Sequence, residues 1–288
     1  MTSPPQRTRR TRGFGPVRFF LRVLRVLRGG DLFLFAVAIT TVSCARPLVK
    51  LPTGPGSPAP DAADALTDAT ASCRASSTFS AEAAVSGSVG GRRLRGNLFV
   101  GVAPPASARI EAVAPAGQPI FIFVANGNEA TLLLPHDNRV LQRGRPAAVL
   151  EAVAGAPLDA VELRETLTAC VLLAAREEGR QLGPTWRVVR VGQTDIYLRR
   201  DAAAGRWQLV AAVHPEWRAE YADFDGGLPR TIRLASVDGK RFDLRLKLSQ
   251  VEMNARLGPE VFRVQIPPDA EPITIEELKR SGPLGSSR

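Results

Sequence analysis

The sequence is poor in the residues that most often build catalytic and metal sites. Its 288 residues include two histidines, three cysteines and two methionines. It has no Gly-x-Ser-x-Gly, no phosphate-binding glycine loop and no paired histidines. Segment 223–227 (DFDGG) lacks the downstream glutamate of an EF-hand and is typical of a hairpin turn. His136 and His214 are expected in surface or capping roles. We therefore expect no enzyme activity, no cofactor and no metal ion.

Lysine is also scarce, and the positive charge is unevenly distributed. Four of the 38 basic residues are lysines, and the formal net charge is +10. Residues 1–43 contain eight arginines and one aspartate, a net charge of +7, which leaves +3 for the rest of the chain. A nucleic-acid-binding body would need its cations on the folded part. The distribution therefore argues against nucleic acid as a partner.

No apolar run is long enough to span a bilayer. The longest, residues 32–43 (LFLFAVAITTVS), has twelve apolar or small residues, whereas a transmembrane helix needs about 20. A basic region followed by a short apolar run and a small residue predicts a secretory signal peptide over 1–43. Residues 19–28 also fit a basic amphipathic helix on a membrane surface. A start site near Val26 and a twin-arginine signal are further alternatives.

The end of this signal resembles a lipobox, the site where bacterial lipoprotein signals are cut before a cysteine that becomes acylated. The residues are Thr41-Val42-Ser43-Cys44, with threonine where leucine is usual. Cys44 is therefore the predicted lipidation site. The alternative is a secreted protein in which Cys44 is incidental. Residues 44–60 carry five prolines and two glycines, so we expect a semi-rigid tether that does not pack.

The remaining chain, residues 61–273, predicts strands, then two helices, then strands. Helices are expected at 61–73, 146–154 and 159–175, the last with a buried stripe of Leu163, Leu167, Cys170 and Val171. Twelve alternating segments between 79 and 248 predict strands, a stretch at 262–266 closes the body, and 274–288 is expected to be a flexible tail. The pattern indicates a mainly β (α+β) domain. We expect an incompletely closed antiparallel barrel of about eleven strands with helices on its concave side.

The body is similar to the LolA/LolB superfamily of bacterial lipoprotein carriers and receptors, and is closest to LolB-like outer-membrane lipoproteins. Four segments carry the resemblance, and they are strands and turns rather than catalytic motifs. They are Ala114-Pro115-Ala116-Gly117 before IFIF, Gly155-Ala156-Pro157-Leu158 before Leu163, PRTIRL before LRLK, and the closing VFRVQIPP. The likeness covers about 210 residues. It implies the open barrel and a ligand cavity inside it.

The resemblance implies binding of the acyl chains of lipoproteins or lipids inside the barrel. Alkyl chains need apolar walls, because each buried methylene contributes about 0.8 kcal/mol. The expected cavity residues are Phe121, Phe123, Leu132, Leu134, Leu163, Leu167, Val188 and Leu244. The expected function is a monomeric, lipid-anchored protein of the outer membrane that faces the periplasm, assists lipoprotein localisation and meets a periplasmic carrier. The alternative is a structural or envelope-interaction lipoprotein in which the same residues form a filled core.

One turn departs from the family. LolB carries a protruding Asn-Pro-Leu-Gly turn whose leucine is implicated in delivering lipoproteins to the membrane, and the corresponding membrane-facing turn here is Pro115, Ala116 and Gly117. Alanine buries less apolar surface than leucine, a loss of about 1 kcal/mol of membrane affinity. Delivery of lipoproteins is therefore in doubt on this turn alone.

Two cysteines remain once Cys44 is acylated. In an oxidising compartment an even pair of cysteines is more often bridged than free, so we expect a disulfide between Cys73 and Cys170. The alternative is two small buried side chains that never meet.

Overall fold

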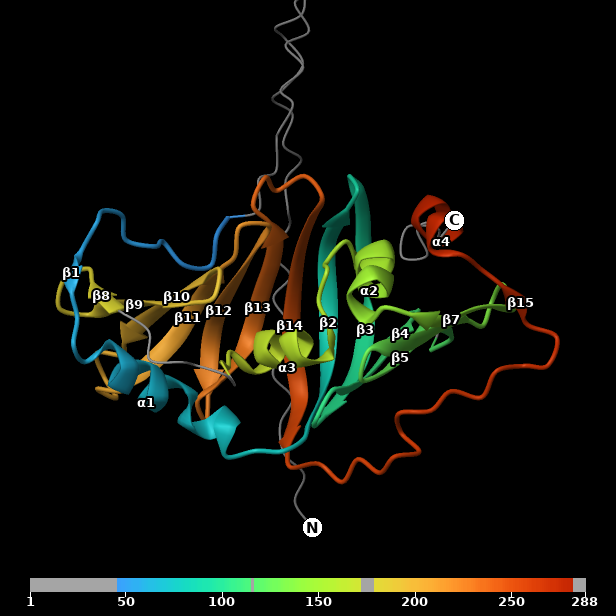
Figure 1. The fold of residues 1–288 in the computed structure, drawn as a ribbon, viewed down its shortest axis with the longest axis horizontal. Coiled ribbons are helices and arrows are strands. Elements are labelled where there is room, and N and C mark those ends of the chain that lie inside the picture. The colour runs from blue at the N-terminus through green and yellow to red at the C-terminus, as the bar shows by residue number, and fades with distance from the viewer. Residues whose placement is uncertain (1–45, 115–116, 172–178, 282–288) are drawn as a thin grey trace, which may run out of the picture. The chain divides into compact units, whose positions relative to one another are not determined.

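The structure is a computed structural model that describes residues 46–114, 117–171 and 179–281. Residues 45–288 form one compact unit by themselves. In this unit the described strands belong to a single sheet, with the order β1-β8-β9-β10-β11-β12-β13-β14-β2-β3-β4-β5-β6-β7-β15 (Figure 1). Neighbouring strands are antiparallel except for the parallel pair β15 and β7. The two edge strands, β1 and β15, do not pair, so the barrel is open, as predicted.

Six strands precede the central helices: β2 (Phe79–Val89), β3 (Arg92–Ala103), β4 (Ser107–Val113), β5 (Pro119–Asn126), β6 (Glu129–Leu134) and β7 (Arg139–Gly144). Six long strands follow them: β9 (Trp186–Val191), β10 (Thr194–Arg200), β11 (Trp207–Val213), β12 (Trp217–Asp225), β13 (Leu228–Ser236) and β14 (Phe242–Met253). All twelve correspond to strands expected from the alternation. The predicted fold class, mainly β with an incompletely closed barrel and helices, is confirmed.

Local sequence explains the strands and their turns. In β2 the inward residues Phe79, Ala81, Ala83 and Val85 are buried, while their neighbours are more exposed. This alternation is that of a sheet with one covered face. Gly90 and Gly91, with φ of 55° and 77°, connect β2 to β3. A two-residue hairpin turn of this kind needs positive φ at both positions, which glycine adopts without strain.

The sequence does not predict three short strands: β1 (Ser57–Pro58), β8 (Gly179–Gln181) and β15 (Glu271–Pro272). Two or three residues are too few to show any alternation. The expected closing stretch at 262–266 is wrong as a strand. Its backbone instead runs across the sheet, where the Phe262 carbonyl accepts the Asn126 side-chain amide at 2.8 Å.

Four helices lie among the described residues: α1 (Ala62–Arg74), α2 (Pro146–Ala154), α3 (Ala160–Thr168) and α4 (Ile275–Ser281). The first two agree with the predictions to within a residue. The expected helix over 159–175 is too long, because Ala169 adopts a left-handed conformation (φ 49°) that ends α3. Cys170 and Val171 therefore lie beyond the helix, and 172–175 fall outside the described residues. None of these helices has the length and apolar content needed to cross a membrane.

The segment expected to be an unpacked tether instead lies along the outer face of the sheet. Val49 is buried, and the Leu48 N–H donates to the Glu220 carboxylate on β12 at 2.5 Å. Farther along, β1 pairs with β8. Proline-rich sequence has no periodicity that predicts packing, and here it packs through main-chain bonds. We call residues 46–58 the N-terminal strap.

A second extended segment covers the outer face of the other half of the sheet. The carbonyls of Val261 and Arg263 accept hydrogen bonds from Arg109 on β4 at 3.0 and 2.9 Å. The chain then forms β15 and α4, in which Leu278 is fully buried. The expected flexible tail is therefore wrong from 275 to 281, because an apolar side chain of α4 joins the core. We call residues 254–273 the C-terminal strap.

The helices cover the concave inner face. Helix α1 packs on β8 to β11, α2 on β6 and α4, and α3 on both β4 and β13. Strands β4 and β13 are separated in the sheet by β14, β2 and β3, so curvature brings both to one helix (Figure 1). The core therefore lies between the inner face and these helices.

Candidate functional site: the apolar interior

Seven of the eight expected cavity residues meet in one buried cluster on the inner face. They come from β5, β6, α3 and β14, and each is at most 8% exposed: Phe121, Phe123, Leu132, Leu134, Leu163, Leu167 and Leu244. Alternation puts the strand residues on one face, and the i, i+4 spacing puts Leu163 and Leu167 on one side of α3. The sequence therefore identified a shared apolar interior, and in this structure its members are packed against one another as a core.

Val188 is the exception. It is buried but lies outside the cluster, whereas its neighbour Val189 belongs to it. Because successive side chains of a strand point to opposite faces, Val188 faces outward on β9. The expectation that Val188 lines the interior is therefore wrong. Val188 and Val189 are adjacent and equally apolar, so the sequence does not show which of the two faces inward.

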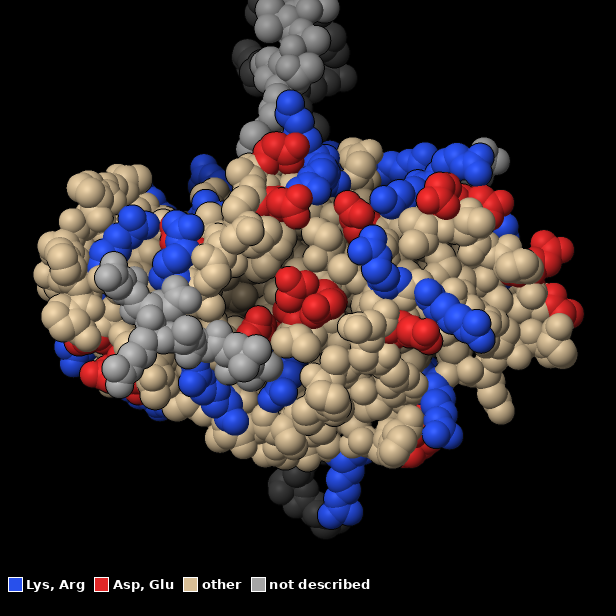
Figure 2. All heavy atoms as spheres, in the orientation of Figure 1, with Lys and Arg blue, Asp and Glu red and all other residues tan. Residues whose placement is uncertain are grey.

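The interior is less tightly covered along β14, β2 and β3. Leu98 and Leu246 point inward and pack against the cluster, yet both stay partly exposed. The β2 residues beside them, Ala83 and Val85, are small or medium in size. On the same side of the molecule, Figure 2 shows a hollow over β12 and β13 beside a group of acidic side chains. The alternation in β3 and β14 would have found Leu98 and Leu246.

Helix α3 is held in the interior by its own capping. The Asp159 carboxylate accepts the Val161 and Glu162 N–H groups at 2.8 and 2.9 Å, and Glu162 accepts the Asp159 N–H at 2.9 Å. This capping box satisfies main-chain donors that would otherwise be unpaired. Burial raises the pKa of Glu162, because the charged form is less well solvated there.

Buried polar groups lie beside the apolar cluster. Tyr221 on β12 is 3% exposed, and burial is the main cause of its raised pKa, with the charge of Glu165 on α3 adding to it. The phenol therefore stays neutral at physiological pH. Arg187 on β9 is paired with Asp61 at 2.7 Å, and its guanidinium lies 5.0 Å from the centre of the Trp207 ring. No motif in the sequence marks these residues.

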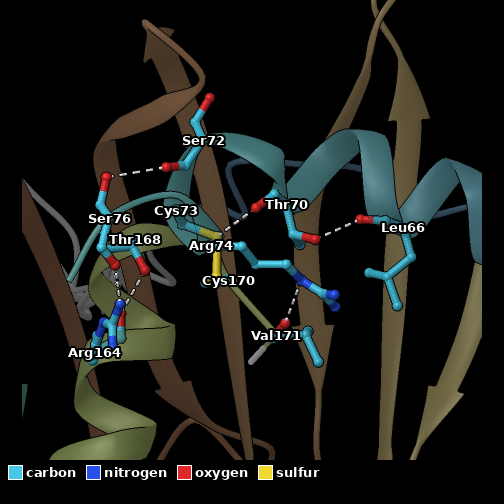
Figure 3. Close-up of a disulfide and its surroundings, with 10 residues drawn as sticks. All are labelled: Leu66, Thr70, Ser72, Cys73, Arg74, Ser76, Arg164, Thr168, Cys170 and Val171. Atoms are coloured by element: carbon cyan, nitrogen blue, oxygen red, sulfur yellow. Dashed lines mark hydrogen bonds between the residues drawn. A yellow bond between two sulfur atoms is a disulfide. The ribbon is translucent and has the colours of Figure 1, made fainter. Parts of the chain in front are cut away.

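A disulfide ties two parts of the helical cover together (Figure 3). Cys73 of α1 and Cys170, just after α3, are bridged with their Cα atoms 6.0 Å apart, so the expected pairing is present. Two arginines reinforce the junction from opposite sides. Arg74 donates to the Val171 carbonyl at 3.2 Å, and Arg164 donates to the Ser76 carbonyl. Helices α1 and α3 are therefore held to each other as well as to the sheet.

A separate surface pocket lies outside the interior. Its volume is about 400 Å³, and it is bounded by the β3–β4 connection, the end of β5 and the C-terminal strap. Asn126 and Phe262 both line the pocket, and the Asn126 side-chain amide donates a hydrogen bond to the Phe262 carbonyl. Its lining includes none of the eight expected cavity residues.

The structure describes some of the other predicted site residues and leaves others outside the described ranges. Cys44, Pro115 and Ala116 lie outside the described residues, but Gly117 is described, and its N–H donates to the Ala114 carbonyl at 2.8 Å to close the turn. His214 accepts the Glu216 N–H and stacks on Trp217, which is a turn-capping role. Among the described residues, no three His, Cys, Asp or Glu side chains are grouped to hold a metal ion.

No family model matches the sequence, and no curated protein matches it either. Solved structures are similar in fold. A LolA superfamily protein from Nitrosomonas europaea is 10% identical and aligns over 70% of this chain and 97% of its own, with a TM-score of 0.47. A Vibrio parahaemolyticus domain, described as an outer membrane lipoprotein-sorting protein, is 10% identical over 76% and 97% of the two chains, with a TM-score of 0.42.

A third similar structure is the Mycobacterium tuberculosis lipoprotein LppX. It is 13% identical and aligns over 68% of this chain and 94% of its own, with a TM-score of 0.30. The LolA superfamily, which the sequence resembles, is also named among these structures, and at these identities the similarity is one of fold only. Closeness to LolB within that superfamily stays a prediction.

Proposed function

We propose that this chain is a lipid-anchored protein that faces the periplasm, binds the acyl chains of lipids or lipoproteins in its interior and assists lipoprotein localisation to the outer membrane. It acts without bond-making chemistry, as a monomer, and receives its cargo from a periplasmic carrier. The observation that carries the proposal is the inner face itself. Strands from both halves of the sheet present apolar side chains to one interior, and short helices close it.

Acyl binding needs an entry, and the partly exposed Leu98 and Leu246 provide the apolar surface closest to one. Helix α3 contacts both β4 and β13. An alkyl chain that enters at Leu98 and Leu246 would displace α3 and pack against the apolar cluster. Because burial of methylenes supplies the affinity, a charge on this surface would remove it.

The experiment measures binding of a fluorescent fatty acid to residues 45–288. Leu246→Glu and Leu98→Glu should each weaken binding at least tenfold, while Lys247→Glu, the outward neighbour of Leu246, should leave it unchanged. Phe123→Glu and Leu167→Glu test the deeper interior, and circular dichroism establishes that each variant is folded. Unchanged binding in the folded Leu246→Glu and Leu98→Glu variants would contradict the proposal.

A second function is favoured by a specific observation, the close packing of the expected lining residues. Phe123 and Leu132 are fully buried. A filled core of this kind suits a structural or envelope-interaction lipoprotein that binds other proteins. Fatty acid that co-purifies with the protein and is released on denaturation would favour acyl binding, whereas ligand-free protein that still binds no added fatty acid would favour this alternative.

The proposed anchor is acylation of Cys44 after cleavage of residues 1–43. Ala45 follows the cysteine, whereas aspartate at that position often marks inner-membrane retention in the systems that the sequence resembles. Cys44→Ser should abolish the acyl mass increment and release the protein from membranes. Membrane partition and a mass shift identical to the unchanged protein would contradict the anchor.

The turn at 114–117 decides between binding and delivery. If Ala116 occupies the place of the family's inserting leucine, Ala116→Leu should increase association with vesicles. Ala116→Ser serves as the matched control, because it changes the residue without adding apolar surface. Equal association of both variants would remove this turn from the proposed function.

A further inference from the structure

One end of the sheet gathers cations that form no ion pair with any residue in the described part of the chain. The β2–β3 and β13–β14 hairpin turns are neighbours at this end because β14 pairs with β2. In Figure 1 it is the upper end, where Figure 2 shows both basic and acidic side chains on the face toward the viewer. Six basic residues on these hairpins have no ion-pair partner within the described ranges, and together we call them the hairpin-tip patch: Arg92, Arg93, Arg95, Lys240, Arg241 and Arg245.

The strand register places several of these cations on the outer face. Arg95 and Arg245 are both paired with Ser86, on opposite sides of β2. Because neighbouring strands are about 4.8 Å apart, their Cα atoms are about 10 Å apart, with a small hydroxyl side chain between them. Arg93, which is paired with Ser88 one row nearer the turn, is also exposed. Such a surface suits several phosphate groups rather than one deeply bound anion.

Acidic residues at this end leave the positive charge in excess. Both carboxylate oxygens of Asp243 accept hydrogen bonds from Arg233, each at 2.9 Å, so Asp243 does not neutralise the patch. Asp238 accepts the Ser236 hydroxyl and the Lys240 N–H within its own turn. Glu216 is exposed, and its carbonyl accepts the Arg241 side chain.

The N-terminal strap begins at the same end. The Arg245 guanidinium donates to the Arg46 carbonyl at 3.4 Å, and the Leu48 N–H is bound to Glu220. Cys44 precedes Arg46 by two residues, which span at most about 7 Å. An acyl group on Cys44 would therefore be attached beside the hairpin-tip patch. Val237, at the tip of the β13–β14 hairpin, is 61% exposed and adds an apolar side chain there.

We propose that the hairpin-tip patch docks the folded unit on the headgroups of an anionic phospholipid bilayer. The orientation of this docking rests on the anchor of the proposed function, since acylated Cys44 would insert at the same end. The patch supplies electrostatic attraction to lipid phosphates, Val237 enters the headgroup region, and the strap keeps the unit against the surface instead of suspending it on a free tether.

The test uses residues 45–288, which form the compact unit and lack Cys44, in sedimentation with vesicles. Binding is expected to vesicles of phosphatidylglycerol and phosphatidylethanolamine, to be absent from pure phosphatidylcholine vesicles and to weaken as salt is raised. Each cation near an anionic surface contributes about fivefold in affinity. The triple variant Arg92→Gln, Arg93→Gln, Arg95→Gln should therefore lose at least tenfold.

A matched triple variant at the opposite end of the sheet separates a defined patch from net charge. Arg143→Gln, Arg206→Gln and Arg256→Gln remove the same charge from exposed positions. Their affinity should stay within twofold of the unchanged protein. Equal losses in both triple variants, or equal binding to neutral vesicles, would overturn the proposal. A failure of Cys44 acylation or of fatty-acid binding leaves this assay unaffected, so the outcomes are distinguishable.

Discussion

The inner face of the sheet is covered by helices, whereas its outer face is covered by two extended straps. Inside, apolar side chains from β5, β6 and α3 pack without ionic partners. Outside, main-chain groups of the straps bind charged side chains, as Leu48 binds Glu220 and Val261 binds Arg109. The inner face is stabilised by burial of area, and the outer face by directional bonds to buried or half-buried ions. Mutations on the two faces should therefore differ in size and in their dependence on pH.

The largest expected loss of stability comes from removing the disulfide that joins α1 to the residues after α3. Replacing Cys73 and Cys170 by alanine opens a loop of 97 residues. In the chain-entropy model this costs about 4 to 5 kcal/mol of unfolding free energy. Urea unfolding of the oxidised protein against the double variant measures it. The reduced, unsubstituted protein should have the same stability as the double variant. A difference below about 1 kcal/mol between the oxidised protein and the double variant would show that α1 stays docked without the bridge.

The next effect compares one phenylalanine on each face. Phe123 on β5 is fully buried inside, and Phe99 on β3 is 44% exposed outside. Phe123→Ala should cost about 3 to 5 kcal/mol, because it removes buried area and leaves a cavity. Phe99→Ala should cost about 1 kcal/mol or less. Thermal and urea unfolding measure both, and equal costs would contradict the contrast between the faces.

A third prediction tests the attachment of the N-terminal strap. Glu220 is 1% exposed and pairs with Arg218 and Arg233. Glu220→Ala should cost about 3 kcal/mol, because it removes a buried carboxylate and leaves two half-buried cations with fewer partners. It should also accelerate hydrogen exchange at the Leu48 amide. Glu216→Ala, at an exposed position four residues earlier, should change neither stability nor Leu48 exchange. An unchanged Leu48 exchange rate in Glu220→Ala would show that Glu220 does not hold the strap.

The smallest effect concerns the start of α1. The hydrogen bond from Arg187 lowers the pKa of Asp61, so the carboxylate is favoured in the folded state. Its contribution is therefore present above the unfolded value of 3.8 and lost as pH falls through the folded-state pKa. Asp61 is half exposed, so Asp61→Asn should cost less than about 1 kcal/mol at pH 7.

The matched variant for this prediction is Asp64→Asn in the same helical turn, which should leave stability nearly unchanged. The cost of Asp61→Asn should shrink below about pH 4, because the carboxyl of the unchanged protein becomes protonated there. Unfolding curves recorded between pH 7 and pH 3 measure this. A cost that grows toward low pH would contradict the assignment to the Arg187 pair.

Sequence patterns were most informative where the side chains alternate over many residues. The twelve long strands, α2 and seven of the eight interior residues follow from such patterns, because one face of each element is buried. The prediction for Val188 is wrong because Val189 beside it is equally apolar, and the sequence does not distinguish the inward from the outward residue. The helix predicted over 159–175 is too long because apolar spacing continues through Cys170 and Val171, while the left-handed Ala169 ends α3.

By itself, the sequence determined an open β-sheet with helices inside and the apolar inner face, while the tertiary structure decided that Cys73 and Cys170 meet. Only the tertiary structure decided how the outer face is covered. The straps bind through main-chain groups to Glu220 and Arg109, residues that lie on other strands far away in the sequence. Every residue carries such main-chain groups, so no side-chain pattern marks which of them will be used. The hairpin-tip patch depends in the same way on the pairing of β14 with β2, which brings two separately unremarkable hairpins together.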